Sequence, residues 1–387
     1  MTDCGDFVNS DDEEDVDDLE ENAEPLLLYF QQPFYYPICI GNVLAQRYRI
    51  EHKLGHGGFS TVWMAHDIVT KKDVALKITI LARGTADPES TMHNEIRQRV
   101  RDTSKLLLSR ETFSLPSPKG RHRVLVFPLR GPSLHSCFAS MSMADRMSAA
   151  KQVLQALDCL HDANIVHRDL NDKNTMCGIV PLDAYDIKMK YQYLGRPKKI
   201  PLQTPDGMQG ELVRPVMVPP SLLTKSFYLG DFGLAMNAGT SANYKPQSPS
   251  AWCAPERLHN TDPSSASDMW SYMCLFTELY LGTLPWSIYG DVLPGMVKVL
   301  GPLPQTWSGS YHQPTRIDAS WYDPKKQPEH TLEAMIARAR PNISPTERAH
   351  VLSFMRKGFS YNPQHRMTAA QLLCNVSFQA VMRVYSA

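Results

Sequence analysis

The stretch from His167 to Asn174 constrains this chain more than any other part of its sequence. It reads His-Arg-Asp-Leu-Asn-Asp-Lys-Asn, and so places the carboxylate of Asp169 and the amide of Asn174 in one short loop. A carboxylate there can accept the proton of a hydroxyl group, and an amide oxygen beside it can hold a magnesium ion. The loop is therefore suited to a reaction at a hydroxyl group, with Asp169 as a candidate base and Asn174 as a candidate metal ligand.

Two more motifs lie on either side of this loop. Val74-Ala75-Leu76-Lys77 is an aliphatic run that ends in a lysine, and a lysine among apolar residues needs an anion as its partner. Asp231-Phe232-Gly233 lies downstream and offers a second carboxylate to a metal ion. In their order and spacing, the three motifs resemble those of the eukaryotic protein kinases across nearly the whole chain.

The resemblance implies an α+β, bilobal protein-kinase fold with a small β-rich N-lobe and a larger α-helical C-lobe. The expected parts are a disordered acidic arm at residues 1–24, an extended strap at 25–47, the N-lobe and hinge at 48–130, and the C-lobe at 131–387. The proline-rich residues 178–226 separate the catalytic loop from Asp231. We expect them to be an insertion on a loop, ordered in part at most.

The resemblance also implies a nucleotide site. The glycines at positions 55, 57 and 58 would let the backbone approach phosphate groups closely. Phe127 would be the gatekeeper residue, while the carbonyl of Pro128 and the N–H of Arg130 would bind adenine. The residues expected to surround ATP are Leu54, Gly55, Gly57, Val62, Ala75, Lys77, Phe127, Pro128, Arg130 and Met176.

The same resemblance assigns the reacting groups. The catalytic residues it implies are Lys77, Glu95, Asp169 and Lys173, and the metal ligands are Asn174 and Asp231. Glu95 is the expected ion-pair partner of Lys77, with Glu89 and Glu111 also in range.

Several positions depart from the kinase pattern, among them Trp252, which replaces a common tyrosine, and Ser60, which replaces the usual third glycine. Arg99, four residues after Glu95, stands where an apolar residue normally completes the column that joins the lobes. Asn171 stands where serine/threonine kinases place a lysine for the γ-phosphate, and Lys173 could supply that charge instead. Pro249 stands where a threonine often contacts the catalytic aspartate, and Ser248 or Ser250 could substitute for it.

The C-terminal half carries structural motifs of the same family. Ala254-Pro255-Glu256, Asp268 and Arg366 resemble residues that build the platform for a peptide substrate. We expect Asp268 to brace the catalytic loop and Arg366 to form a buried pair with Glu256. Residues 142–163 are predicted to form an amphipathic helix, because apolar side chains recur there at three- and four-residue steps.

Residues 54–63, Leu-Gly-His-Gly-Gly-Phe-Ser-Thr-Val-Trp, narrow the resemblance to one branch. With the insertion, Pro249 and the sequence Leu-Gly-Pro-Leu-Pro at 300–304, they are similar to the serine/arginine-rich protein kinase family of the CMGC group, in its divergent fungal form. The resemblance implies a serine/threonine kinase that uses ATP and Mg²⁺ on protein substrates. The family's Arg/Ser-rich splicing factors are the candidate substrates.

The composition of the chain limits which ligands and which cellular compartment we expect. Residues 1–24 hold twelve acidic residues and no Lys or Arg, so the remaining chain has 40 basic against 28 acidic residues. A basic body suits a phosphate-bearing ligand, although an ordinary solvated surface explains it equally well. The eight cysteines are scattered, which favours free thiols in a reducing compartment such as the cytoplasm, the nucleus or both, and no apolar run is long enough for a membrane span. We expect the chain to be a monomer. We expect no direct contact with nucleic acid or membrane.

Three functions are compatible with these residues. The first is an active protein kinase, since all five residues expected to carry the chemistry are present, namely Lys77, Glu95, Asp169, Asn174 and Asp231. The second is a pseudokinase that serves as a nucleotide-binding scaffold, for which Asn171 and Arg99 are the evidence. The third is a small-molecule phosphotransferase, which the peptide-platform motifs disfavour. Turnover of ATP that depends on Asp169 separates the first function from the second.

Overall fold

The computed structural model describes residues 4–8, 17, 19, 21–30, 34–81, 87–247, 249–286, 292–307, 325 and 327–386. The chain divides into two compact units. The first unit comprises residues 1–90, 107–132 and 177–224, and the second comprises residues 91–106, 133–176 and 225–387. Within the described residues, every helix is too short or too polar to span a lipid bilayer.

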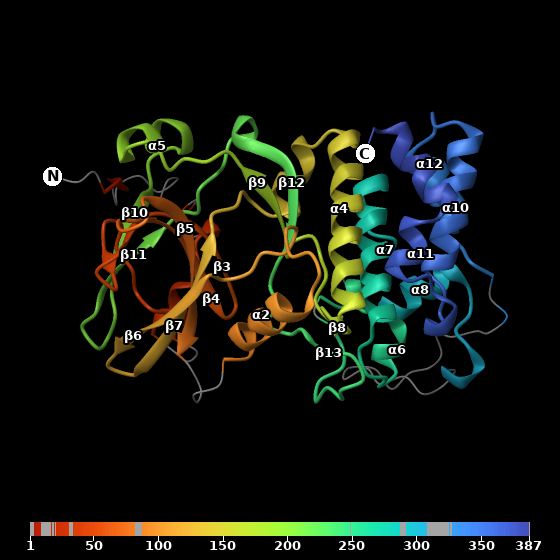
Figure 1. Cartoon of the computed structure of the whole chain (residues 1–387), viewed down its shortest axis with the longest axis horizontal. Helices are drawn as coiled ribbons and strands as arrows, with labels where there is room; N and C mark the ends of the chain where they lie inside the picture. Colours follow the sequence, from red (N-terminus) through yellow and green to blue (C-terminus); the bar gives the residue numbers. More distant parts are fainter. Residues whose placement is uncertain are drawn as a thin grey trace. The chain divides into compact units, whose positions relative to one another are not determined.

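A six-stranded antiparallel sheet forms the centre of the first unit, in the order β2-β3-β4-β5-β7-β6 (Figure 1). Its strands are β2 (Val43–Leu44), β3 (Tyr48–Gly57), β4 (Ser60–Asp67), β5 (Lys72–Leu81), β6 (Glu111–Ser117) and β7 (Gly120–Pro128). Aliphatic and aromatic side chains such as Ile50, Trp63 and Leu76 point to one core on this sheet. Burying each of them contributes about 1.5–3 kcal/mol, so the alternating pattern of the strands fixes which face is covered.

The strap, residues 25–47, packs on this sheet. Ile38 and Ile40 lie in the same apolar core as the strand residues. The N–H of Gly41 donates to the carbonyl of Ile50 at 2.9 Å, and the N–H of Ile50 donates to the carbonyl of Asn42 at 2.8 Å. A short 3-10 helix, η1 (Leu26–Tyr29), opens the strap, so the segment is not extended throughout.

The structure describes residues 4–8, 17, 19 and 21–24 of the acidic arm, and the expected disorder of the whole arm stays a prediction. Strand β1 (Asp6–Phe7) pairs in parallel with strand β10 (Lys198–Gln203), and Arg196 forms an ion pair with Asp6 at 2.7 Å. Glu24 is fully buried in an ion pair with Lys53. Basic partners elsewhere in the chain therefore neutralise acidic side chains that would otherwise repel one another. Residues 9–16, which contain the centre of the acidic run, lie outside the described residues.

The expectation that residues 178–226 form a loop insertion, ordered in part at most, is wrong. Residues 177–224 belong to the first unit, not to the C-lobe, and contain helix α5 (Ile187–Leu194) and the antiparallel strands β10 and β11 (Gln209–Val213). Lys190 of α5 is buried between Glu51 and Asp73, with Nζ–O distances of 2.7 and 2.5 Å. The prolines of this segment suggested a loop, but the buried ion pairs that order it join residues far apart in sequence.

Helices make up most of the second unit, where α4 (Met143–Asp162) and α7 (Ser265–Leu281) lie side by side (Figure 1). Ser142 caps α4 by accepting a hydrogen bond from the N–H of Asp145, and the helix confirms the one predicted at residues 142–163. Almost all of α7 is buried, which explains its continuous apolar character. The remaining helices of eight or more residues are α2 (Pro88–Arg99), α8 (Val292–Leu300), α9 (Leu332–Ala339), α10 (Pro345–Gly358) and α12 (Val376–Val384).

Short elements complete the described chain. Strands β8 (Ile165–Val166) and β13 (Met236–Asn237) pair in the second unit, directly before the catalytic loop and shortly after Asp231. The other short elements are α3 (Leu134–Cys137), β9 (Thr175–Ile179), β12 (Leu223–Leu229), α6 (Pro255–Leu258) and α11 (Ala369–Leu373). Arg366 forms the predicted buried pair with Glu256, at 2.7 and 3.0 Å, and thereby fixes α6.

The buried lysine of the insertion gives a test of its structural role. Lys190→Ala should lower the free energy of unfolding by about 3–5 kcal/mol, because Glu51 and Asp73 then stay buried without their shared cation. Urea denaturation measures the change. Lys188→Ala, at an exposed position on the same helix, should change the same quantity by less than about 0.5 kcal/mol. Similar losses for the two variants would show that the insertion is not held through Lys190.

Candidate active site

The glycine-rich turn, residues 55–60, joins β3 to β4 in the first unit. A Cβ atom added to Gly55, Gly57 or Gly58 would meet no atom within 4 Å, and none of the three has a positive φ. Neither packing within the protein nor a left-handed backbone therefore requires these glycines. The open space above the turn fits a ligand that approaches the backbone, and backbone N–H groups are suited to phosphate oxygens.

An apolar cluster lies near this turn in the first unit. It brings together four of the residues predicted to surround ATP, namely Leu54, Val62, Ala75 and Phe127, and adds Leu107, Leu125 and Leu129. Pro128 ends β7 and Arg130 follows in the same unit. Met176 belongs to the second unit, where it forms an isolated bridge with Ser133.

Lys77 pairs with Glu89, so the prediction of Glu95 as its partner is wrong. The Nζ atom of Lys77 lies 3.0 Å from each carboxylate oxygen of Glu89. The carboxylate of Glu95 instead accepts from Asn237 at 3.0 Å and from Arg99 at 3.3 Å. Six residues of an α-helix turn through about 600°, so the two glutamates of α2 project about 120° apart and cannot serve the same lysine.

Because Glu89 and not Glu95 is the partner of Lys77, Arg99 no longer counts as a departure from the kinase pattern. Four residues after Glu89 stands His93, which is fully buried, and not Arg99. The His93 ring meets Phe232 edge-on at 5.7 Å, and Phe232 meets His167 edge-on at 5.1 Å. A continuous column of three rings therefore runs from α2 to the catalytic loop within the second unit.

The catalytic loop is fixed by Asp268, as the sequence predicted. Its carboxylate accepts hydrogen bonds from the N–H groups of His167 and Arg168, at 2.7 and 2.9 Å. Burial acts to raise the pKa of Asp268, but the hydrogen bond from His161 and the neighbouring histidine charges outweigh it and lower the pKa. The ring of His167 bonds to the carbonyl of Gly230 at 3.0 Å, which ties the loop to the Asp231 motif.

Asp169 is held by two amides of its own loop. The Nδ2 atom of Asn174 lies 2.8 Å from both the backbone oxygen and the Oδ2 atom of Asp169. Burial, with a smaller contribution from the charge of Asp231, raises the pKa of Asp169. A carboxylate with a raised pKa is a stronger base toward a hydroxyl proton.

The donor set fits a divalent cation. Because Asn174 uses its amide nitrogen on Asp169, its amide oxygen can face a metal, and Asp231 offers a carboxylate nearby. Both ligands are oxygen atoms, which Mg²⁺ prefers. A cation at this position would also relieve the repulsion between Asp169 and Asp231.

Asn171 has a structural role in the loop. Its Oδ1 atom accepts from the N–H groups of Lys173 and Asn174, at 2.9 and 3.1 Å, and its Nδ2 atom donates to Asp169. The side chain therefore folds the loop and does not reach outward. Lys173 is exposed, and its ammonium group forms no hydrogen bond or ion pair with the described residues.

Sequence reasoning missed Gln247, which binds the backbone of the catalytic loop next to Asp169. Its Nε2 atom donates to the carbonyl of Leu170 at 3.0 Å, and its Oε1 atom accepts from Arg257 at 3.1 Å. Ser250 begins a 3-10 turn and forms no hydrogen bond with Asp169, while Ser248 lies outside the described residues. No sequence signal pointed to Gln247, because its partners come from three separate segments.

A cavity of about 170 Å³ borders the catalytic loop in the second unit. Asp172 and Glu278 contribute carboxyl groups to it, and His135 bonds to Asp172 at 2.7 Å. The Glu278 carboxyl has no hydrogen-bond partner among the described residues. Burial, together with the charge of Asp172, raises the pKa of Glu278 to about 8. The cavity therefore presents acidic groups that a cation would stabilise.

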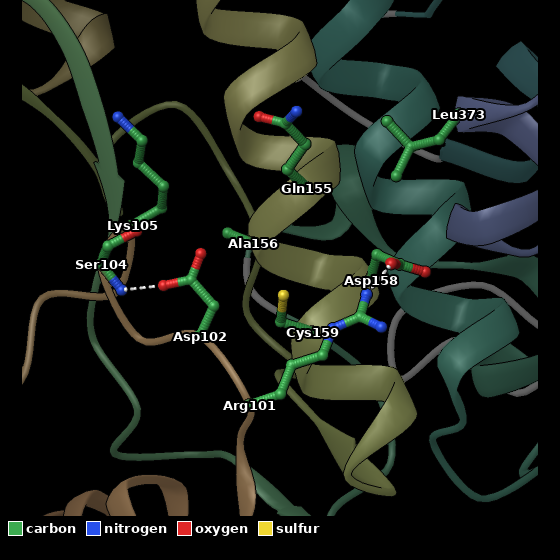
Figure 2. A pocket seen from close by; sticks show the side chains of 9 residues that line it. All are labelled: Arg101, Asp102, Ser104, Lys105, Gln155, Ala156, Asp158, Cys159 and Leu373. Atoms are coloured by element: carbon green, nitrogen blue, oxygen red, sulfur yellow. Dashed lines mark hydrogen bonds and ion pairs between the residues drawn. The ribbon is translucent and has the colours of Figure 1, made fainter.

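A second cavity, of about 380 Å³, lies elsewhere in the second unit (Figure 2). Arg101 pairs with Asp158 at 2.6 Å, and Asp102 accepts from the N–H of Ser104 at 2.8 Å. Its charged groups thus bond to one another or to their neighbours, and no residue of the catalytic loop lines it. We assign it no role in the site.

The pairing of Lys77 can be tested with matched variants of α2. Glu89→Gln should weaken ATP binding about tenfold, because Lys77 loses the charge-assisted hydrogen bonds that orient it. Glu95→Gln should change the affinity less than about twofold. Isothermal titration calorimetry measures both. A larger effect at Glu95 than at Glu89 would contradict the register of α2 described here.

Known proteins resemble the chain over most of its length. A model of the protein kinase domain matches residues 48–190 and 217–378. A serine/threonine protein kinase of Aspergillus fumigatus is 25% identical over 377 residues, which are 92% of this chain and 89% of that protein. Protein kinase dsk1 of Schizosaccharomyces pombe is 34% identical over 179 residues, covering 42% of this chain. SRSF protein kinase 3 of Homo sapiens is 30% identical over 192 residues, covering 46% of this chain.

The matched region is only part of several relatives. It spans 32% of dsk1, 32% of the human kinase and 17% of the serine/threonine-protein kinase spk-1 of Caenorhabditis briggsae, which is 27% identical over 49% of this chain. The crystal structure of a kinase domain has the same fold, with a TM-score of 0.62 and 19% identity over 89% of this chain and 98% of that one. Because the domain match covers most of its residues, the chain belongs to the protein kinase domain family.

Proposed function

We propose that the chain is a serine/threonine protein kinase that transfers the γ-phosphate of ATP, with Mg²⁺, to hydroxyl groups of basic, Arg/Ser-rich protein segments. The observation that carries this proposal is the catalytic loop. Its base, Asp169, is oriented by Asn174, while Asp268 fixes the backbone on the N-terminal side of the base. Such preorganised groups lower the barrier by positioning and by stabilising charge.

Each residue of the site has a separate task in this reaction. Asp169 accepts the proton of the substrate hydroxyl as that oxygen bonds to the γ-phosphorus and the bond to the β-bridging oxygen breaks, which releases ADP. Asn174 and Asp231 would hold the metal ion, which supplies neutralising charge to the phosphates. Lys77, oriented by Glu89, would bind phosphate oxygens. The exposed ammonium of Lys173 would face the transferred group.

The scaffold alternative loses both of its supporting observations. Asn171 shapes the loop around Asp169, so its presence does not remove a needed group from the site. Arg99 does not stand in the ring column, because His93 occupies that place. Lys173 remains as a cation for the γ-phosphate.

The acidic cavity supports a basic substrate. A guanidinium group that enters beside Asp172 and Glu278 would form charge-assisted hydrogen bonds with carboxylates that otherwise repel each other. The names of the relatives agree with this chemistry, since one of them is an SRSF protein kinase. The eight cysteines, all free, further support action in the cytoplasm or nucleus.

Transfer of phosphate from Mg²⁺-ATP to peptides tests the proposed function. We expect the protein to phosphorylate serine in an Arg/Ser-rich peptide, and Asp169→Asn to lower kcat at least about 100-fold, because general-base catalysis is lost. The variant should keep its affinity for ATP, which controls for misfolding. Absence of transfer by the wild-type protein, with ATP binding intact, would overturn the proposed activity in favour of a scaffold.

Glu278→Gln tests the acidic cavity. At pH 9, where Glu278 is ionised, the variant should raise KM for the Arg/Ser-rich peptide about tenfold and leave KM for a neutral serine peptide unchanged. Because the raised pKa of about 8 keeps Glu278 largely protonated at neutral pH, and a guanidinium binds the ionised form, the wild-type affinity should rise from pH 7 to 9. The variant should lose this rise. Glu333→Gln, which removes a carboxylate paired with Arg356 outside the cavity, is the control and should match the wild type.

A further inference from the structure

The strap contacts the glycine-rich turn directly. The hydroxyl of Tyr35 donates a hydrogen bond to the carbonyl oxygen of Gly57. Next to it, the carbonyl of Phe34 accepts from the N–H of Leu81 at 3.2 Å, at the end of β5. The N–H of Ile80 in turn donates to the carbonyl of Phe59 at 2.9 Å. The turn is therefore held from both the strap and β5.

The bond from Tyr35 determines the direction of a whole peptide group. The C=O of Gly57 and the N–H of Gly58 belong to one planar trans peptide and point in opposite directions. Glycines on both sides of this peptide leave its rotation unrestricted by side chains. Fixing the carbonyl therefore fixes the N–H of Gly58, which points away from Tyr35. Backbone N–H groups in such turns are the groups that bind phosphate oxygens.

A rigid socket holds the Tyr35 ring in place. The side chain is 3% exposed, and its ring meets Tyr29 edge-on at 5.7 Å. The other buried members of this cluster are Leu19, Ala23, Leu202 and Leu212. Leu202 lies in β10 and Leu212 lies in β11, so the insertion forms one side of the socket. Burial raises the pKa of Tyr35, which keeps the hydroxyl a donor at neutral pH.

A second contact from the same end of the chain reaches the turn. The ring of His56 forms a hydrogen bond with the backbone of Asn22. Close by, the buried Lys53–Glu24 pair fastens β3 to the same segment, and Tyr29 donates a hydrogen bond to Glu24. Residues before the sheet thus contact strand β3 at three positions, namely Lys53, His56 and Gly57, where the strand leads into the glycine-rich turn.

We propose that Tyr35 is a positioning residue for nucleotide binding, which holds the Gly57 carbonyl so that the N–H of Gly58 faces the phosphates of ATP. The strap and the insertion are its support. The strap and the insertion lie outside the ordinary kinase sequence pattern, and both would serve to position the glycine-rich turn. The inference rests on the proposed function only in assuming that the glycine-rich turn covers the nucleotide phosphates.

Comparison of ATP with adenosine tests this proposal, because adenosine has no phosphate groups. Calorimetric titration of the full chain with Mg²⁺-ATP should give a Kd about three- to tenfold higher for Tyr35→Phe than for wild type, as expected for one lost hydrogen bond. The Kd for adenosine should not change. In steady-state kinetics KM for ATP should rise by the same factor, while kcat stays within about twofold.

Tyr191→Phe is the matched control. Its buried hydroxyl donates to the carbonyl of Glu51, in the same strand as Gly57 but away from the turn, at 3.2 Å. The control should leave the ratio of the two affinities unchanged, even if both variants melt at a lower temperature. Equal weakening of ATP and adenosine by Tyr35→Phe, or no change in either, would overturn the role of Tyr35 and leave the kinase function intact. Failure of the wild-type protein to bind ATP would overturn both.

Discussion

The carboxylate of Asp268 fixes the backbone of the catalytic loop, and the position of Asp169 depends on that backbone. It binds two consecutive backbone N–H groups, at His167 and Arg168, and so imposes the local backbone conformation. Arg168 adopts a φ of 72°, which a non-glycine residue avoids unless its surroundings enforce it. The ring of His167 then reaches Gly230, and the next residue, Asp169, enters its own hydrogen bonds. One buried charge thus orders the base and the segment that carries Asp231.

How much of the site was predictable depends on the range of each contact. Asp169, Asn171 and Asn174 bond to one another within the catalytic loop, so the residue types of that short stretch revealed its arrangement. The partner of Lys77 was ambiguous because several glutamates lie within reach in sequence, and only the register of α2 selects Glu89. The ring contact between His93 and Phe232 and the hydrogen bonds of Gln247 join segments that are distant in sequence. Those contacts leave no periodic signal in the sequence.

The fold was likewise predictable where it depends on local sequence, and not where it depends on contacts between distant segments. The strands of the sheet and helix α4 follow from apolar periodicity and a capping serine, which are local properties. The insertion has the proline content of a loop, and the first residues have the charge of a disordered tail. The insertion and the described part of the acidic arm each supply an ionic partner to another segment, as Lys190 does for Glu51 and Glu24 does for Lys53. Composition alone cannot show that such partners exist.

The assignment of residues 177–224 to the first unit has a consequence for synthesis of the chain. The first unit is assembled from three separate stretches, so no continuous fragment contains it without also containing parts of the second. During translation, the sheet emerges with Glu51 and Asp73 well before Lys190 is made. These carboxylates must remain solvated until then, so the first unit cannot reach its final packing at the ribosome ahead of the catalytic loop. The two halves of this kinase must therefore mature together, with the chain crossing between them several times.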